Sequence, residues 1–251
     1  MKQEHINKSF DSELDRLYDE IRQMGELAIA QLNAAIDVLN RRDSNAAARV
    51  VANDEAIDTL ENEISMDVLK LMAADAEIDA LEHVVSQDVI RLLALRQPMA
   101  RDLREVYAAL RISSDIERIG DYASNVAKRS MVLNNNPPLP ATARIGRLAR
   151  TAVQLLSDAL QAYAEGDADL AAKVRDADAD LDAMYTSFFR ELVTYMMEDP
   201  RTIGACTHLM FMAKNIERIG DHATNIAENT WFVVHGDMPE GERKKDDKTS
   251  E

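Results

Sequence analysis

The sequence has few of the residues that cross-link chains or interrupt helices. Its 251 residues include one cysteine, eight glycines and six prolines, and aromatic residues make up 5%. A single thiol, Cys206, excludes an internal disulfide, and its apolar neighbours in a helical pattern predict a packed, unreactive side chain. No segment alternates apolar and polar residues as a half-buried strand would. The composition therefore predicts an all-α protein.

Several functional classes find no support in the sequence. No stretch of eighteen residues is free of charge, and residues 1–5 lack the apolar core of a signal peptide, so we expect a cytoplasmic protein. The net charge of −16 repels nucleic acids and anionic membranes, so we expect no direct nucleic-acid binding. We also expect no enzymatic activity, because there is neither a phosphate-binding glycine loop nor an evident Ser, Cys and His set.

A twelve-residue segment occurs twice, one hundred residues apart. Nine of the twelve positions are identical between residues 116–127 and 216–227, and both copies begin with Ile-Glu-Arg-Ile-Gly-Asp. Apolar residues three or four positions apart form one stripe of an amphipathic helix in each copy. Beside it runs a second stripe of side chains that carry oxygen atoms: Glu117, Asp121 and Asn125 in the first copy, and Glu217, Asp221 and Asn225 in the second.

The repeat divides the chain into two similar halves. We expect a first three-helix bundle at residues 1–134, an Asn/Pro linker at 135–140, a second three-helix bundle at 141–235, and a disordered charged tail at 236–251. The first helix should begin near Ser9. Turns or breaks are expected at residues 42–44, 97–98, 165–167 and 198–200.

The first half contains a shorter internal duplication. Seven residues between positions 54 and 68 recur between positions 75 and 89, so segment 54–74 resembles segment 75–95. The second copy follows the first at a spacing of 21 residues, which equals three heptads, so both copies can keep the same face toward a partner helix. A helix lengthened by about 31 Å, at 1.5 Å per residue, has to project, fold back or exchange with a neighbouring chain. We expect the duplication to promote helix exchange.

Acidic pairs on consecutive helices should face each other in the second half. If Pro200 marks the turn of an antiparallel hairpin, Asp182 and Glu217 lie on opposite sides of it at nearly equal distances along the chain. Asp178 and Asp221 then share the next level. Four carboxylates can therefore converge in this bundle.

The same register predicts four converging carboxylates in the first half. Around Pro98, Asp79 and Glu117 are equally distant, and so are Asp75 and Asp121. A local hairpin therefore favours the later copy of the duplicated aspartate pair over the earlier one, which is Asp54 and Asp58.

Converging carboxylates without cysteine form a hard oxygen site that suits iron, manganese, magnesium or calcium better than copper. Two carboxylates one turn apart cost an isolated helix about 0.2–0.5 kcal/mol, which a cation would relieve. The alternatives are a solvated acidic face, or neutralisation of the acids by Arg118 and Arg218. Asn125 and Asn225 are either further ligands or only polar positions.

Three groups of residues form a characteristic set: Leu95-Arg96-Gln97-Pro98 with Asp102-Leu103-Arg104, the two Glu-Arg-Ile-Gly-Asp helices, and residues 195–203. This set resembles that of the PhoU family, accessory regulators of bacterial phosphate-specific transport. The resemblance implies two three-helix bundles whose acidic motifs hold a metal ion or a multinuclear cluster. Iron is the first candidate, and manganese, magnesium, zinc and calcium are others.

The resemblance also implies a function without turnover. Proteins of this family repress the phosphate-starvation response and modulate phosphate transport by contacting a membrane histidine kinase and the ATPase subunit of the phosphate ABC transporter. A homodimer is expected. The alternatives are a carboxylate-bridged metal oxidase or metal-storage bundle, which typically uses repeated Glu-x-x-His pairs that this chain lacks, and a helical scaffold without metal.

Overall fold

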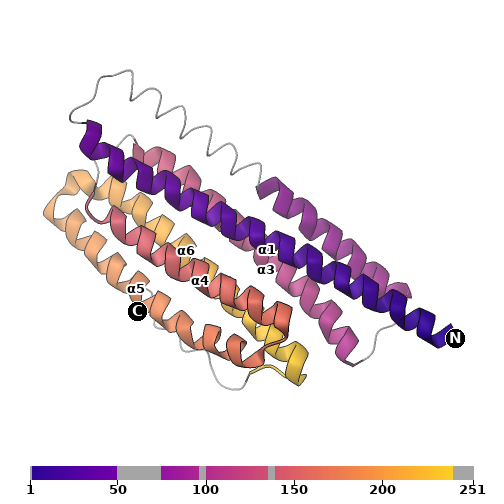
Figure 1. Ribbon diagram of the computed structural model, residues 1–251. Coiled ribbons are helices and arrows are strands. Elements are labelled where there is room, and N and C mark those ends of the chain that lie inside the picture. The colour runs from indigo at the N-terminus through magenta and orange to yellow at the C-terminus, as the bar shows by residue number, and fades with distance from the viewer. Residues whose placement is uncertain (1, 50–74, 96–99, 135–138, 240–251) are drawn as a thin grey trace.

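The computed structural model describes residues 2–49, 75–95, 100–134 and 139–239, and every regular element in these ranges is a helix (Figure 1). The all-α prediction is confirmed. The helices are α1 (Lys2–Arg49), an unlabelled helix at residues 75–95, α3 (Arg101–Asn134), α4 (Thr142–Glu165), α5 (Ala168–Glu198), the 3-10 turn η1 (Pro200–Thr202) and α6 (Ile203–His235).

The helices form two three-helix bundles, with α1, helix 75–95 and α3 in one and α4, α5 and α6 in the other (Figure 1). The bundles meet where α3 packs against α6 and α1 against α4. The α3–α6 pair is antiparallel. Near the start of α3, Arg104 Nε donates to the carbonyl of Val233, 3.3 Å away. Near the end of α3, the Arg129 guanidinium lies 4.2 Å from the centroid of the Phe211 ring, close to the start of α6.

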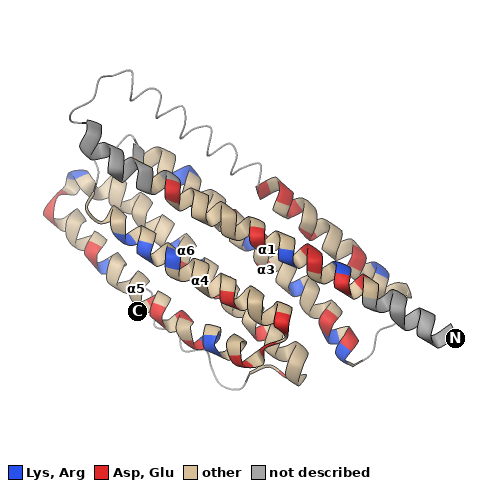
Figure 2. Ribbon diagram, in the orientation of Figure 1, with Lys and Arg blue, Asp and Glu red and all other residues tan. Residues whose placement is uncertain are grey.

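The core follows the helical period of the sequence. Eight positions of α1, spaced three or four apart, face the core. Leu14 is half-buried, and the other seven are buried: Leu17, Ile21, Met24, Ala28, Leu32, Ala35 and Leu39. Acidic residues lie along the outer faces, including those of α5 and helix 75–95 (Figure 2). In the described ranges, none of the helices has a stretch long and apolar enough to cross a membrane.

Two of the predicted turns are confirmed in the second bundle. Gly166 ends α4 with a φ of 64°, a conformation that glycine adopts without steric cost. Asp167 then caps α5, its Oδ1 accepting a hydrogen bond from the Leu170 N–H at 2.9 Å. Between α5 and α6, Asp199 caps η1, which begins at Pro200.

The predicted turn at residues 42–44 is wrong, because α1 continues through it to Arg49. Aspartate and serine favour helix starts, but neither glycine nor proline interrupts this segment, and three alanines at 46–48 favour helix propagation. The helix also begins earlier than expected, at Lys2 rather than near Ser9. Several predictions lie outside the described residues: segment 54–74, the break at 97–98, linker positions 135–138 and tail positions 240–251.

Candidate functional site

The acidic residues of the second half converge between α5 and α6. Asp178 and Asp182 on α5 are buried, and Glu217 on α6 is only 3% exposed. Burial raises the pKa of Glu217 to about 7, and the neighbouring charges of Asp221 and Asp182 contribute in the same direction. Glu217 on α6 therefore lies close to Asp182 on α5, as an antiparallel hairpin around Pro200 predicts.

The corresponding residues of the first half converge between helix 75–95 and α3. Partial desolvation, followed by the charges of Asp75, Asp121 and Glu82, raises the pKa of Asp79, a residue that is exposed on helix 75–95. Burial and then the charge of Asp121 likewise raise the pKa of Glu117. The charge of Asp79 adds to this rise. Asp79 thus lies within electrostatic reach of Asp75, Asp121 and Glu117, the three carboxylates grouped with it by the register around residue 98.

A glycine sits at the centre of each acidic cluster, where neighbouring helices approach closely. A Cβ atom at Gly220 would lie 3.0 Å from Asp178 Oδ1, and one at Gly120 would lie 3.4 Å from Asp75 Oδ1. Asp75 in the first bundle therefore occupies the place of Asp178 in the second. The other candidate pair, Asp54 and Asp58, lies outside the described residues.

A cationic side chain lies beside the carboxylates in each cluster. Lys214 Nζ lies 2.9 Å from Glu217 Oε2, where it partly opposes the rise in the pKa of that carboxyl. In the first half, Arg118 lies 3.5 Å from both Glu117 Oε2 and Asp121 Oδ2. Arg118 is exposed, so its ion pairs contribute little stability, on the order of 0–1 kcal/mol. Of the two arginines considered from the sequence, Arg118 thus forms ion pairs with the acids of its own stripe, whereas the Arg218 guanidinium lies 5.7 Å from the centroid of the Tyr122 ring.

The asparagines considered as ligands have different surroundings. Asn225 donates from Nδ2 to Asp115 Oδ1 on α3, 3.1 Å away, and His222 Nδ1 lies 2.7 Å from the same oxygen. Asn225 thus joins α6 to α3 across the two bundles. Asn125 is exposed on α3.

Sequence reasoning missed two contributors to this region, Asp115 and Lys214. The i, i+3 spacing of Lys214 and Glu217 could have revealed their ion pair. Asp115 had a weaker signal: position 215, one hundred residues later, carries asparagine. Such a difference shows that the two halves diverge at this position, but it does not reveal that α6 is the helix that Asp115 contacts.

The carboxylates suit a hard cation in their chemistry. Desolvation and the repulsion between neighbouring carboxylates raise the pKa values of Asp79, Glu117 and Glu217. A divalent cation would relieve the repulsion. Within the described ranges, no group of three or more His, Cys, Asp or Glu side chains already has an arrangement that could hold a metal ion. Binding would therefore require these side chains to move together, and Lys214 to leave Glu217.

Comparison with known proteins gives a family for this arrangement. A family model described as "PhoU domain" matches residues 21–75, 71–130 and 145–230. The chain belongs to the PhoU family. A Xylella fastidiosa (strain 9a5c) protein named "Phosphate-specific transport system accessory protein PhoU homolog" is 55% identical over 246 residues, which cover 98% of this chain and 95% of the relative. A Rhizobium meliloti (strain 1021) relative of the same name is 41% identical over 251 residues, covering 100% and 97%.

Solved structures of PhoU proteins share the two-bundle fold. The crystal structure of PhoU from Pseudomonas aeruginosa aligns with a TM-score of 0.79 and 33% identity, covering 91% of this chain and 100% of that one. The PhoU structure from Streptococcus pneumoniae, at 23% identity, has a TM-score of 0.72 over 92% of this chain and 99% of that one, and it supports the fold alone.

Proposed function

We propose that this chain is a non-enzymatic, cytoplasmic accessory protein of phosphate transport that restrains the phosphate-starvation response when phosphate is plentiful. The observation that carries the proposal is the near full-length similarity to relatives named as accessory proteins of phosphate-specific transport, at 55% and 41% identity. The partners are a membrane histidine kinase and the ATPase subunit of the phosphate ABC transporter. A homodimer, with helices exchanged through segment 54–74, is the proposed assembly.

We further propose that each bundle holds a metal ion or metal cluster on its acidic stripe. The support is the convergence of like charges around Gly120 and Gly220 and the raised pKa values there. A cation would neutralise the carboxylates and stabilise the contact between neighbouring helices. The residues that would hold it are Asp75, Asp79, Glu117 and Asp121 in one bundle, and Asp178, Asp182, Glu217 and Asp221 in the other.

Expression of this chain should restore phosphate control in a bacterium that lacks its own PhoU protein. A reporter under a phosphate-starvation promoter, active at high phosphate in the deletion strain, should return to its repressed level. Because the role is proposed to depend on contacts and not on turnover, repression should require expression of the chain at levels comparable to its partners. A reporter that stays active despite normal amounts of folded protein would contradict the regulatory proposal.

Neutralising one acidic stripe should remove about half of the bound metal. The variant Glu217→Gln with Asp221→Asn keeps side-chain size but removes two carboxylates from the second bundle, leaving the first bundle intact. Elemental analysis after dialysis against a defined mixture of iron, manganese, magnesium, zinc and calcium measures the loss. Light scattering on the same samples tests the proposed dimer.

The matched variant Glu117→Gln with Asp121→Asn should remove the other half, and the combined variant should retain none. Exposed acids on α5 provide a control of equal charge: Asp180→Asn with Glu198→Gln should leave the metal content unchanged. Equal metal content in all variants would contradict the proposed sites.

A further inference from the structure

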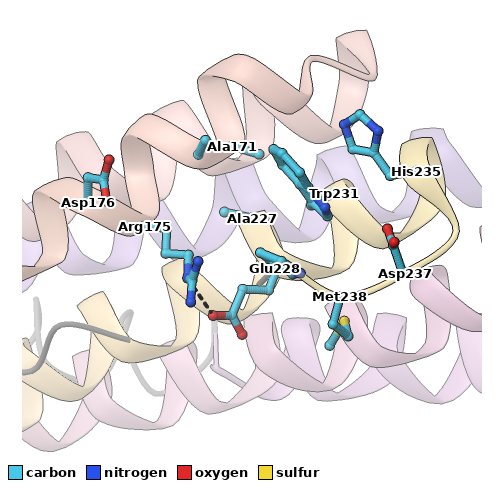
Figure 3. Close-up of a pocket in the computed structure, with 11 residues that line it drawn as sticks. Ala171, Arg175, Asp176, Ala227, Glu228, Trp231, His235, Asp237 and Met238 are labelled. Atoms are coloured by element: carbon cyan, nitrogen blue, oxygen red, sulfur yellow. Dashed lines mark ion pairs between the residues drawn. The ribbon is translucent and has the colours of Figure 1, made fainter. Parts of the chain in front are cut away.

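A pocket of about 560 Å³ lies between α5 and the C-terminal end of α6, away from the acidic stripes (Figure 3). This volume falls within the range of small-ligand sites. Small side chains on both helices, Ala171, Ala172 and Ala227, leave the space open. The polar and aromatic side chains that line it are Arg175, Asp176, Glu228, Trp231, His235 and Asp237.

The charges that line this pocket favour a cation. Three carboxylates and one guanidinium line it, and that guanidinium is already engaged, since Arg175 Nε lies 3.3 Å from Glu228 Oε1 (Figure 3). Neither Asp176 nor Asp237 forms an ion pair with any residue that the structure describes. The C-terminal end of α6, at His235, adds the partial negative charge of its carbonyl groups.

The pocket also offers a π surface for a cation. Trp231 is half-buried against the pocket, and the His235 ring packs on it with a centroid distance of 4.2 Å, which holds the indole in place. Among aromatic side chains, tryptophan attracts cations most strongly, by about 0.5–2 kcal/mol. The indole and the two carboxylates without ion pairs therefore select for the same kind of ligand.

The repeated fold does not require these residues. At an offset of one hundred residues, the first half carries Lys128 in place of Glu228 and exposed Met131 in place of Trp231. The acidic stripes, by contrast, are kept in both halves. The residues Glu228 and Trp231 that α6 contributes to the pocket are thus not repeated in α3, and Trp231 is the only tryptophan in the sequence.

We propose that this pocket binds an alkylguanidinium or alkylammonium group, the chemistry of an arginine or lysine side chain. The cationic head would lie against the Trp231 indole, close to Asp237, and Asp176 on the other side of the pocket would add to the negative potential (Figure 3). An anion such as phosphate is disfavoured, because the only arginine that lines the pocket is already paired with Glu228, and the other carboxylates would repel the anion. This inference goes beyond the proposed regulatory function and does not depend on it.

Two sources can supply such a cation. One is the chain itself, because the pocket lining ends at Pro239 and the basic residues Arg243, Lys244 and Lys245 follow. Arg243 is four residues beyond Pro239, a reach of about 14 Å when extended. The other source is a basic segment of a partner protein. Both present the same group to the pocket, and the experiment below separates them.

Fluorescence of Trp231, the only tryptophan, reports binding directly in the full chain. Titration with N-acetyl-arginine amide should change its emission saturably, with half-saturation below about 1 mM. N-acetyl-citrulline amide has nearly the same shape without the charge, and it should bind at least tenfold more weakly. Inorganic phosphate at equal ionic strength should produce no saturable change.

Substitutions test which side chains are responsible. Asp176→Asn with Asp237→Asn should raise the dissociation constant at least tenfold. The control Asp180→Asn with Glu198→Gln removes the same charge from exposed positions of α5 outside the pocket, and it should bind as the parent does. Thermal unfolding monitored by circular dichroism checks that each variant is folded.

The variant Arg243→Gln, Lys244→Gln, Lys245→Gln distinguishes the two sources. Tighter binding of the added arginine derivative by tenfold or more identifies the tail as the occupant in the parent chain, whereas unchanged binding excludes the tail and leaves a basic side chain of a partner as the proposed source. No saturable change in either chain, equal binding of the citrulline derivative, or a saturable response to phosphate alone would overturn the proposal.

Discussion

Glu217→Gln should stabilise the metal-free protein by about 2–4 kcal/mol at pH 8 and leave its stability at pH 4 almost unchanged. Glu217 is 3% exposed, and burial raises its pKa from 4.5 to about 7. The folded state therefore binds this proton more tightly than the unfolded state. Its contribution to stability is complete below about pH 4.5 and is lost as the pH rises through 7. Glutamine never ionises, so it avoids that loss.

Urea unfolding at several pH values in the presence of a chelator measures this difference. The variant should have a flatter pH profile between 4.5 and 7 than the parent. Glu117→Gln is the matched control, because its side chain is 25% exposed against 3% for Glu217, and it should show a smaller gain. A variant less stable than the parent at pH 8 would show that the ion pair with Lys214 outweighs the cost of burying the carboxylate.

Gly220→Ala should destabilise the parent protein but stabilise a Leu181→Ala background. An added Cβ at Gly220 would lie 2.3 Å from Leu181 Cδ2, too close for the fully buried leucine to remain in place. Such overpacking costs about 1–3 kcal/mol. Leu181→Ala alone should cost about 2–5 kcal/mol through the cavity that it leaves. With the leucine removed, the closest remaining atom is Asp178 Oδ1 at 3.0 Å, which has to give by only a few tenths of an ångström, and alanine at 220 gains its helix propensity, about 1 kcal/mol over glycine.

The four proteins form a double-mutant cycle whose unfolding free energies are measured in urea. Gly204→Ala on the same helix provides the control, because a Cβ there has no atom within 4 Å. That substitution should stabilise both backgrounds by about 0.5–1 kcal/mol. If Gly220→Ala has the same effect in both backgrounds, the close contact of α5 with α6 does not depend on this glycine.

The helical repeat made much of the candidate site predictable. A period of 3.6 residues assigns each position to a face of its helix, so the amino-acid pattern alone indicated the buried positions of α1 and the acidic stripe at Glu217 and Asp221. The break at Pro200 set the level at which Asp182 meets Glu217, because both helices rise by the same distance per residue. The turn predicted at residues 42–44 was wrong because aspartate and serine only favour a helix start. Their preference is too weak to end a helix that is already formed.

The amino-acid sequence by itself determined the helices, their apolar faces and the register of consecutive helices, because these depend on contacts close along the chain. Only the tertiary structure decided that Asp115 meets His222 and Asn225, and that Trp231 lies beside a pocket between α5 and α6. The period of a helix identifies the face that packs but not the distant helix that covers it. That choice depends on how well whole surfaces fit together, which no single stretch of sequence specifies.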